Sequence, residues 1–149
     1  MSEREQGGEG VTGRAQGGSF PNEGQEDVRL EGGCHCGAVR FSVGTPLPAR
    51  VLECDCAICS MTAYLHLIVP RAAFELHSGA DVLHAYRFGT GVARHDFCTV
   101  CGIKSFYVPR SHPQGISVNL RCLDRPPARV EFAAFDRRDW PGNDDDRGD

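Results

Sequence analysis

The sequence lacks a long apolar run. Its longest uncharged apolar runs are of the kind found at residues 65–69, LHLIV, far short of the roughly 20 residues that a membrane span needs. The opening residues, MSEREQ, carry no basic stretch followed by an apolar one, so a secretion signal is also missing. We therefore expect a soluble, cytoplasmic protein with no membrane partner.

Helical periodicity is also missing. No long segment repeats its apolar residues every 3.6 positions, and a single helical turn is expected, at residues 70–73. Short alternating segments are present instead, such as Val39, Phe41 and Val43 between polar residues, and glycine and proline separate them. The expected fold class is mainly β, a small domain of short antiparallel strands. The predicted strands are residues 28–31, 38–43, 50–54, 64–69, 74–76, 82–88, 93–97, 104–108, 116–120 and 130–135.

Large apolar side chains are scarce at both ends of the chain. Residues 1–27 contain seven glycines and six acidic residues, with only Val11 and Phe20 as sizeable apolar side chains. Burial of so little apolar surface does not offset the entropy lost on ordering. We expect a disordered tail at 1–27, one folded domain at 28–135 and a disordered acidic tail at 136–149.

Eight cysteines are present, and without an export signal they favour metal binding or redox chemistry over disulfides. Cys34 and Cys36 are two positions apart, so both side chains point the same way in an extended segment. Cys98 and Cys101 have the spacing of a tight turn, and Gly102 after them tolerates a positive φ. Together the two pairs predict a closed, structural zinc site with four cysteine ligands.

A middle group, Cys54, Cys56 and Cys59, provides three sulfurs for a second zinc. Catalytic zinc sites characteristically have three protein ligands and leave the fourth position to water or substrate. Because zinc with thiolate ligands readily accepts another thiolate, a sulfur-containing substrate is expected. Alternatively, Cys122 or a histidine could close this site and make it structural, or Cys122 could be a buried apolar side chain.

The charge of the domain does not indicate a nucleic-acid partner. The whole chain has a net charge of −4, whereas residues 28–135 hold 11 basic and 8 acidic residues, a net charge of +3. Seven thiolates bound to two divalent zinc ions bring this domain close to neutrality. A basic surface for nucleic acid is therefore not expected.

Three segments carry a resemblance to a known family: GGCHCGAVRF at residues 32–41, the middle cysteine group, and FCxxCG at residues 97–102. They resemble the family of glutathione-dependent formaldehyde-activating enzyme and centromere protein V, over about residues 30–124. KSFYVPRSHP at 104–113 and RCLD at 121–124 look closer to the centromere protein V branch. The resemblance implies a tent-like β fold with two zinc ions. It implies a structural zinc on Cys34, Cys36, Cys98 and Cys101 and a catalytic zinc on Cys54, Cys56 and Cys59.

The activity implied by the resemblance is that of a carbon–sulfur lyase, in which glutathione and formaldehyde combine to S-hydroxymethylglutathione. We hypothesise that zinc lowers the pKa of a thiol such as glutathione, and that the thiolate adds to an aldehyde carbon or leaves from a thiohemiacetal. The alternative is a non-catalytic thiol carrier or protein-interaction module. Short edge strands would allow a homodimer.

Several polar residues are candidates for the remaining chemistry. His35 and Asp55 lie beside cysteine ligands and could handle protons, and Tyr64 and His66 are further candidates on the following strand. Each could equally be a surface or hydrogen-bonding residue. Asn119 and Arg121 could hold a substrate carboxylate. Alternatively, these two side chains make structural hydrogen bonds.

Overall fold

The computed structural model describes residues 27–135, and these form a mainly β domain, as predicted. The two expected disordered tails lie outside the described residues, apart from Asp27 at the start of the first strand. The strands are β1 (Asp27–Gly33), β2 (Arg40–Pro46), β3 (Ala49–Cys54), β4 (Leu65–Pro70), β5 (Phe74–Ser78), β6 (Leu83–Tyr86), β7 (His95–Cys98), β8 (Phe106–Tyr107), β9 (Gly115–Asn119) and β10 (Val130–Phe135).

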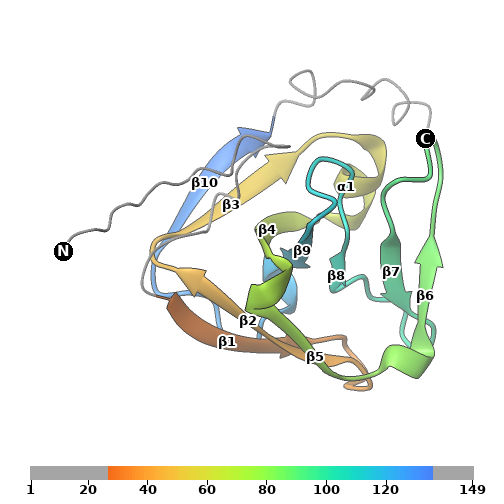
Figure 1. Ribbon diagram of the computed structural model, residues 1–149, viewed down its shortest axis with the longest axis horizontal. Helices are drawn as coiled ribbons and strands as arrows, with labels where there is room; N and C mark the ends of the chain where they lie inside the picture. Colours follow the sequence, from red (N-terminus) through yellow and green to blue (C-terminus); the bar gives the residue numbers. More distant parts are fainter. Residues whose placement is uncertain (1–26, 136–149) are drawn as a thin grey trace.

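Three sheets build the domain. One contains β1, β2 and β5 in that order, a second contains β10, β3, β4, β9 and β8, and the third pairs β6 with β7. In Figure 1 the first sheet lies along the lower left, β10 and β3 at the upper left, and β6 and β7 at the right, with β4, β9 and β8 between them. This arrangement places the core between the sheets.

One strand pair departs from the antiparallel pattern expected from the sequence. β10 pairs with β3 in parallel, with Val130 opposite Ala49 and Phe135 opposite Cys54. The other strand pairs among the described residues are antiparallel. Parallel neighbours require a long crossover connection, and here residues 55–129 provide it, so no local turn signal could reveal the pairing.

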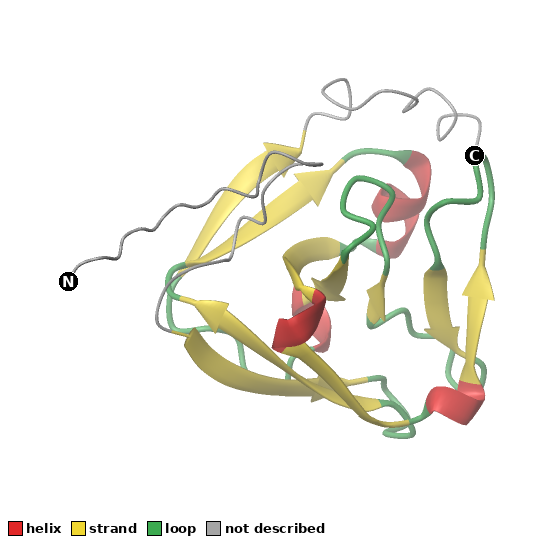
Figure 2. Cartoon of the chain, viewed as in Figure 1, coloured by secondary structure: helices red, strands yellow, loops and turns green. Residues whose placement is uncertain are grey.

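The sequence also failed to predict a short helix, α1 (Ala57–Thr62), which follows the cysteine-rich end of β3 (Figure 2). Six residues are too few to show a helical period. The expected turn at residues 70–73 corresponds to a short 3₁₀ segment, Arg71–Ala73. Across residues 27–135, every helix is too short or too polar to cross a membrane.

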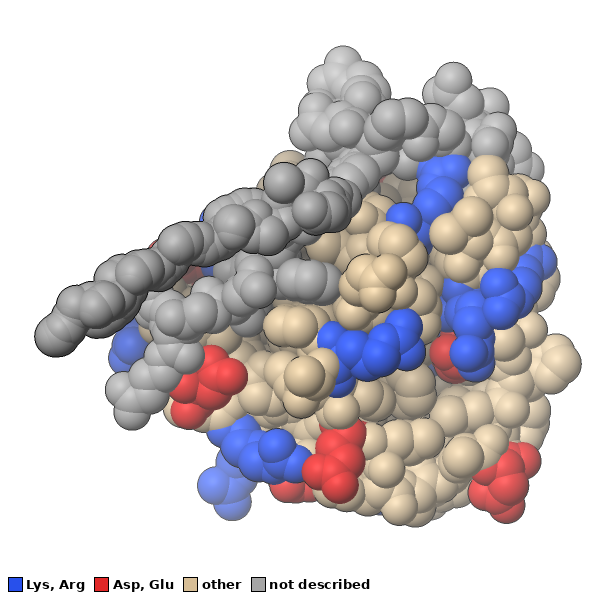
Figure 3. All heavy atoms as spheres, in the orientation of Figure 1, with Lys and Arg blue, Asp and Glu red and all other residues tan. Residues whose placement is uncertain are grey.

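The core is aliphatic and aromatic, and β2 is buried on both faces. Phe41 and Val43 point into the core with Leu67 of β4, and all three are fully buried. Ser42, on the opposite face of β2, is also fully buried because side chains from β1 and β5 cover it. Its hydroxyl contacts Arg29 and lies 2.9 Å from His77 Nε2. On the face shown in Figure 3, basic and acidic side chains are interspersed.

Candidate metal centres and the adjacent pocket

Four cysteine sulfurs converge where the first two strands meet β7. Those of Cys34, Cys36, Cys98 and Cys101, here called the four-cysteine cluster, all lie within 4.8 Å of one another. The sulfurs of Cys34 and Cys36 are 3.6 Å apart, and those of Cys36 and Cys98 are 3.7 Å apart. A Zn–S bond of about 2.3 Å gives a tetrahedron with edges of about 3.8 Å. Both the spacing and the donor type therefore fit a zinc ion.

Glycines make the close approach of these segments feasible. A Cβ atom on Gly33 would lie 2.1 Å from the carbonyl oxygen of Val39, so the chain reversal before β2 requires glycine at this position. Gly102 has a φ of +81°, as predicted, and its N–H donates to the carbonyl of Cys98 at 2.7 Å. Backbone N–H groups of Val39 and Val100 point at the sulfurs of Cys34 and Cys98. Such contacts stabilise thiolates.

The middle cysteines form a second group, here called the three-cysteine cluster. Cys54 ends β3, Cys56 precedes the first residue of α1, and Cys59 lies within the helix one turn later. The spacing of three residues places the last two on one face of the helix, and the three sulfurs lie within 4.8 Å of one another. Cys122 belongs to neither cluster, and burial raises the pKa of its thiol to about 11.

The thiols of the three-cysteine cluster share hydrogen bonds with one another. Hydrogen bonds from Cys54 and Cys59 lower the pKa of Cys56 to about 2, whereas hydrogen bonds with Cys54 and Cys56 raise the pKa of Cys59. The hydrogen bond with Cys56 raises the pKa of Cys54 to about 11. The group therefore holds negative charge in a partly buried position. Three soft sulfurs on one side, one of them anionic before any metal binds, are a donor set suited to zinc.

His66 on β4 contacts this cluster. Its Nε2 lies 3.2 Å from the Cys59 sulfur, and its Nδ1 lies 3.0 Å from the Ser117 hydroxyl oxygen on β9. Burial lowers the pKa of His66 to about 3, so the imidazole is neutral at physiological pH. The Tyr107 hydroxyl lies 3.4 Å from the same Nδ1. Tyr64 packs against the His66 ring and donates to the Ser117 carbonyl at 2.6 Å.

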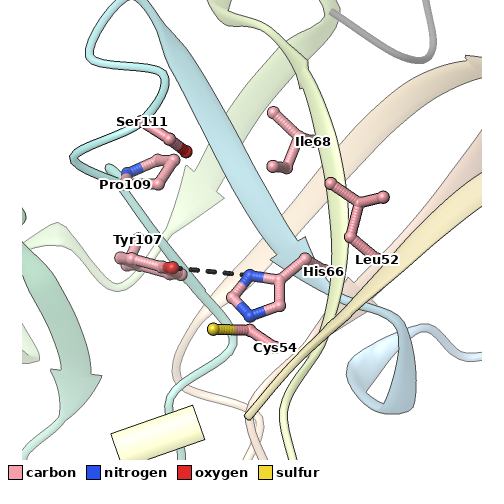
Figure 4. A pocket seen from close by; sticks show the side chains of 7 residues that line it. All are labelled: Leu52, Cys54, His66, Ile68, Tyr107, Pro109 and Ser111. Atoms are coloured by element: carbon pink, nitrogen blue, oxygen red, sulfur yellow. Dashed lines mark hydrogen bonds between the residues drawn. The ribbon is translucent and has the colours of Figure 1, made fainter. Parts of the chain in front are cut away.

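The pocket that reaches the three-cysteine cluster is small, with a volume of about 40 Å³, and is partly open to solvent. Figure 4 shows the Cys54 sulfur and the His66 ring together at one end of it. Leu52 and Ile68 line one side, and the segment with Tyr107, Pro109 and Ser111 lines the other. The pairing of Leu52 with His66 between β3 and β4 brings the apolar wall next to the polar end.

The remaining predicted residues lie in other surroundings. His35 and Asp55 are exposed beside their neighbouring cysteines. Asn119 donates to the Lys104 carbonyl and accepts from the Arg121 backbone N–H, while the Arg121 side chain donates to the Ala63 carbonyl at 2.9 Å. Their roles in proton transfer and carboxylate binding stay predictions.

Several residues at the site were not predicted, because their place depends on strand pairing. They are Ser117, Tyr107, His95 and Lys104.

Fold and site together define a small β protein with two cysteine clusters suited to metal ions. The family described as glutathione-dependent formaldehyde-activating enzyme matches residues 29–135. The chain belongs to this family.

Two known proteins are similar to the chain. A Halomonas elongata protein, which carries the provisional name glutathione-dependent formaldehyde-activating enzyme, is 31% identical over 124 residues, covering 74% of this chain and 78% of that protein. The crystal structure of a Rhodobacter sphaeroides protein has a TM-score of 0.61 and 32% identity, and the match covers 70% of this chain and all of that one. The similarity to each extends over most of the described domain.

Proposed function

We propose that the protein is a zinc-dependent enzyme of the carbon–sulfur lyase type that acts on the adduct of a thiol, such as glutathione, with an aldehyde. The observation that carries this proposal is the three-cysteine cluster, whose Cys54 lines a pocket. Family membership supports a glutathione-related activity. We assign a structural zinc to the four-cysteine cluster and a catalytic zinc, with one position for the thiol, to the three-cysteine cluster.

A zinc ion at the three-cysteine cluster would supply a Lewis acid that lowers the pKa of an incoming thiol. The thiolate sulfur then adds to the aldehyde carbon, and the carbonyl oxygen takes up a proton to give a thiohemiacetal. Elimination of the thiol is the reverse reaction. The hydroxyls of Tyr107 and Ser111, two residues that line the pocket, are candidates to donate a proton to that oxygen. His35 and Asp55 are candidates for proton exchange with solvent.

His66 positions the cluster in this scheme. As a neutral imidazole it donates one N–H, and the Cys59 sulfur 3.2 Å from Nε2, which would be a thiolate with zinc bound, is the acceptor that this proton favours. Nδ1 then accepts from the Ser117 hydroxyl. The hydrogen bond draws charge from the sulfur and fixes the ring at the end of the pocket.

The pocket walls favour a particular kind of aldehyde. Leu52, Ile68 and Pro109 present apolar surface beside Cys54, and burial of each methylene group against such walls contributes about 0.8 kcal/mol. We infer that an aldehyde with a small apolar substituent fits better than formaldehyde, which has none. Asn119 and Arg121 are candidates for holding the carboxylate of the thiol.

Two further assignments are part of the proposal. Residues 104–113 and 121–124 support a place in the centromere protein V branch of the family. None of the eight cysteines, all of which lie within residues 27–135, forms a disulfide, which supports a reducing compartment such as the cytoplasm.

The deciding experiment measures zinc content and glutathione binding in the wild type and in Cys56→Ser. We expect two zinc ions per chain in the wild type and one in the variant, with glutathione binding lost. Cys122→Ser is the matched control and should keep both zinc ions. One zinc in the wild type, or binding that does not depend on Cys56, would contradict the proposal. Glutathione binding without turnover of any aldehyde would favour a thiol carrier.

A further inference from the structure

The chain has a single lysine, Lys104, beside fifteen arginines. It precedes β8, and its side chain is only 8% exposed. An ammonium group removed from water is strongly destabilising unless hydrogen bonds and opposite charge compensate it. The surroundings of this one lysine therefore require explanation.

The ammonium group is surrounded by neutral rings. Its Nζ lies 2.6 Å from His95 Nδ1, 4.0 Å from the centre of the Tyr107 ring and 4.7 Å from that of Tyr64. Burial lowers the pKa of His95 to about 3, so its Nδ1 is a neutral acceptor, and burial raises the pKa of both tyrosines. These groups accept a hydrogen bond and provide cation–π contacts, but they carry no negative charge.

Carboxylates supply little of that charge. Among residues 27–135, no carboxylate lies within ion-pair distance of Lys104. The buried carboxylate of Asp96 is 2.9 Å from the guanidinium of Arg94. Asp96 interacts with Lys104 only at longer range.

The strongest negative charges that act on Lys104 are those of the three-cysteine cluster, ahead of that of Asp96. The Tyr64 and Tyr107 rings that cover the ammonium group also pack against His66, which contacts Cys59. Burial lowers the pKa of Lys104 to about 8, while the thiolates of Cys59, Cys56 and Cys54 act in the opposite direction. The ammonium form therefore predominates at neutral pH.

We propose that Lys104 is a positioning residue that favours an anionic thiolate over a neutral ligand at the three-cysteine cluster. This inference rests on the proposed function. Three thiolates and one zinc ion carry a charge of −1, and a bound substrate thiolate makes it −2, its proton having gone to solvent. One buried cation nearby offsets half of that charge. At an effective dielectric constant of about 20, the attraction corresponds to an affinity gain on the order of tenfold.

The test uses the full, zinc-loaded chain with three substitutions of Lys104. Lys104→Met keeps an apolar stem, Lys104→Gln keeps a donor for His95, and Lys104→Arg keeps the charge. Calorimetry measures the affinity for glutathione and for S-methylglutathione, a neutral thioether. We expect the Met and Gln variants to bind glutathione about tenfold more weakly, with S-methylglutathione unchanged and two zinc ions retained. The Arg variant should bind glutathione more tightly than the Met and Gln variants, because it keeps the positive charge.

Arg125→Met removes an exposed cation and is the matched control, which should leave both affinities unchanged. Wild-type glutathione affinity in the Met and Gln variants overturns the inference and leaves the proposed function standing. If the affinities for glutathione and S-methylglutathione fall equally, or if the Arg variant binds glutathione as weakly as the Met variant, Lys104 has a packing role and the inference is overturned. If Lys104→Met does not fold, Lys104→Gln decides. A wild type that binds no glutathione overturns the proposed function, and the inference with it.

Discussion

The Nε2 atom of His66 lies 3.2 Å from the sulfur of Cys59, and this contact joins β4 to the three-cysteine cluster. The ring is held on its other side by Ser117 on β9. With both nitrogens engaged and its pKa lowered to about 3 by burial, the imidazole is better suited to orienting a thiolate than to accepting a proton.

Replacing His66 by Phe should therefore weaken metal binding at one cluster only. Loss of a hydrogen bond to a metal ligand typically lowers metal affinity by about 10- to 100-fold. We expect a competing chelator to remove one of the two zinc ions from the variant at a lower chelator concentration than it needs with the wild type. His84→Phe, at an exposed position on β6, is the control. Zinc release from the His66→Phe variant at the same chelator concentration as from the His84→Phe control would contradict the role given to His66.

Serine substitutions should separate the two clusters by stability. The four-cysteine cluster joins the turn after β1 to the end of β7, so Cys98→Ser should prevent folding or lower the thermal midpoint strongly. Cys56→Ser should retain the β-sheet circular dichroism spectrum. The comparison uses thermal unfolding of both variants beside the wild type. A fold that tolerates Cys98→Ser as well as Cys56→Ser would show that the first cluster does not stabilise the domain.

Filling the pocket should change aldehyde selectivity. Leu52→Trp places a large ring beside Cys54, so we expect the rate with butanal and glutathione to fall by about tenfold while formaldehyde is affected much less. Zinc content is measured alongside the rate. Met61→Trp introduces the same ring at a position that is 86% exposed and serves as control. Loss of both reactions to the same extent would argue against a substituent site in this pocket.

Acid should destabilise the domain partly through His95. Burial lowers its pKa to about 3 from an ordinary value of 6.5, so between these values the unfolded chain binds more protons and the unfolding free energy falls as pH falls. At pH 5 this amounts to about 2 kcal/mol relative to neutral pH.

Urea unfolding of zinc-loaded wild type and His95→Gln at pH 7 and pH 5 measures this contribution. Between pH 7 and pH 5, the unfolding free energy of the variant should fall by about 2 kcal/mol less than that of the wild type. His84→Gln, at an exposed position, serves as control. An identical loss in wild type and His95→Gln would show that His95 does not titrate as described.

The sequence predicted the cysteine clusters because their geometry is local. Cysteines two or three positions apart bring their sulfurs together through local backbone geometry, as Cys54, Cys56 and Cys59 do. The helix that carries Cys59 was missed, since six residues give no period. Two cysteine pairs that lie far apart in sequence, one before β2 and one at the end of β7, were assigned to a single site because a tetrahedral zinc ion needs four ligands.

The residues around the clusters could not be predicted in the same way. His66, Ser117 and Tyr107 meet only because β4 pairs with β9 and β9 with β8. A buried lysine is equally invisible to an alternation pattern, which indicates exposure for charged residues by default. The single unusual signal was compositional, since one lysine stands among fifteen arginines.

The parallel pairing of β10 with β3 also affects how the domain is made. During synthesis all seven cluster cysteines leave the ribosome before Val130–Phe135, so the outer edge of β3 has no partner until the end. An unpaired edge is a template for association with other chains. Capture of metal by nascent thiols and closure of this edge are therefore separate events in time. A chain cut before residue 130 would keep every cysteine ligand and still expose the strand that carries Cys54.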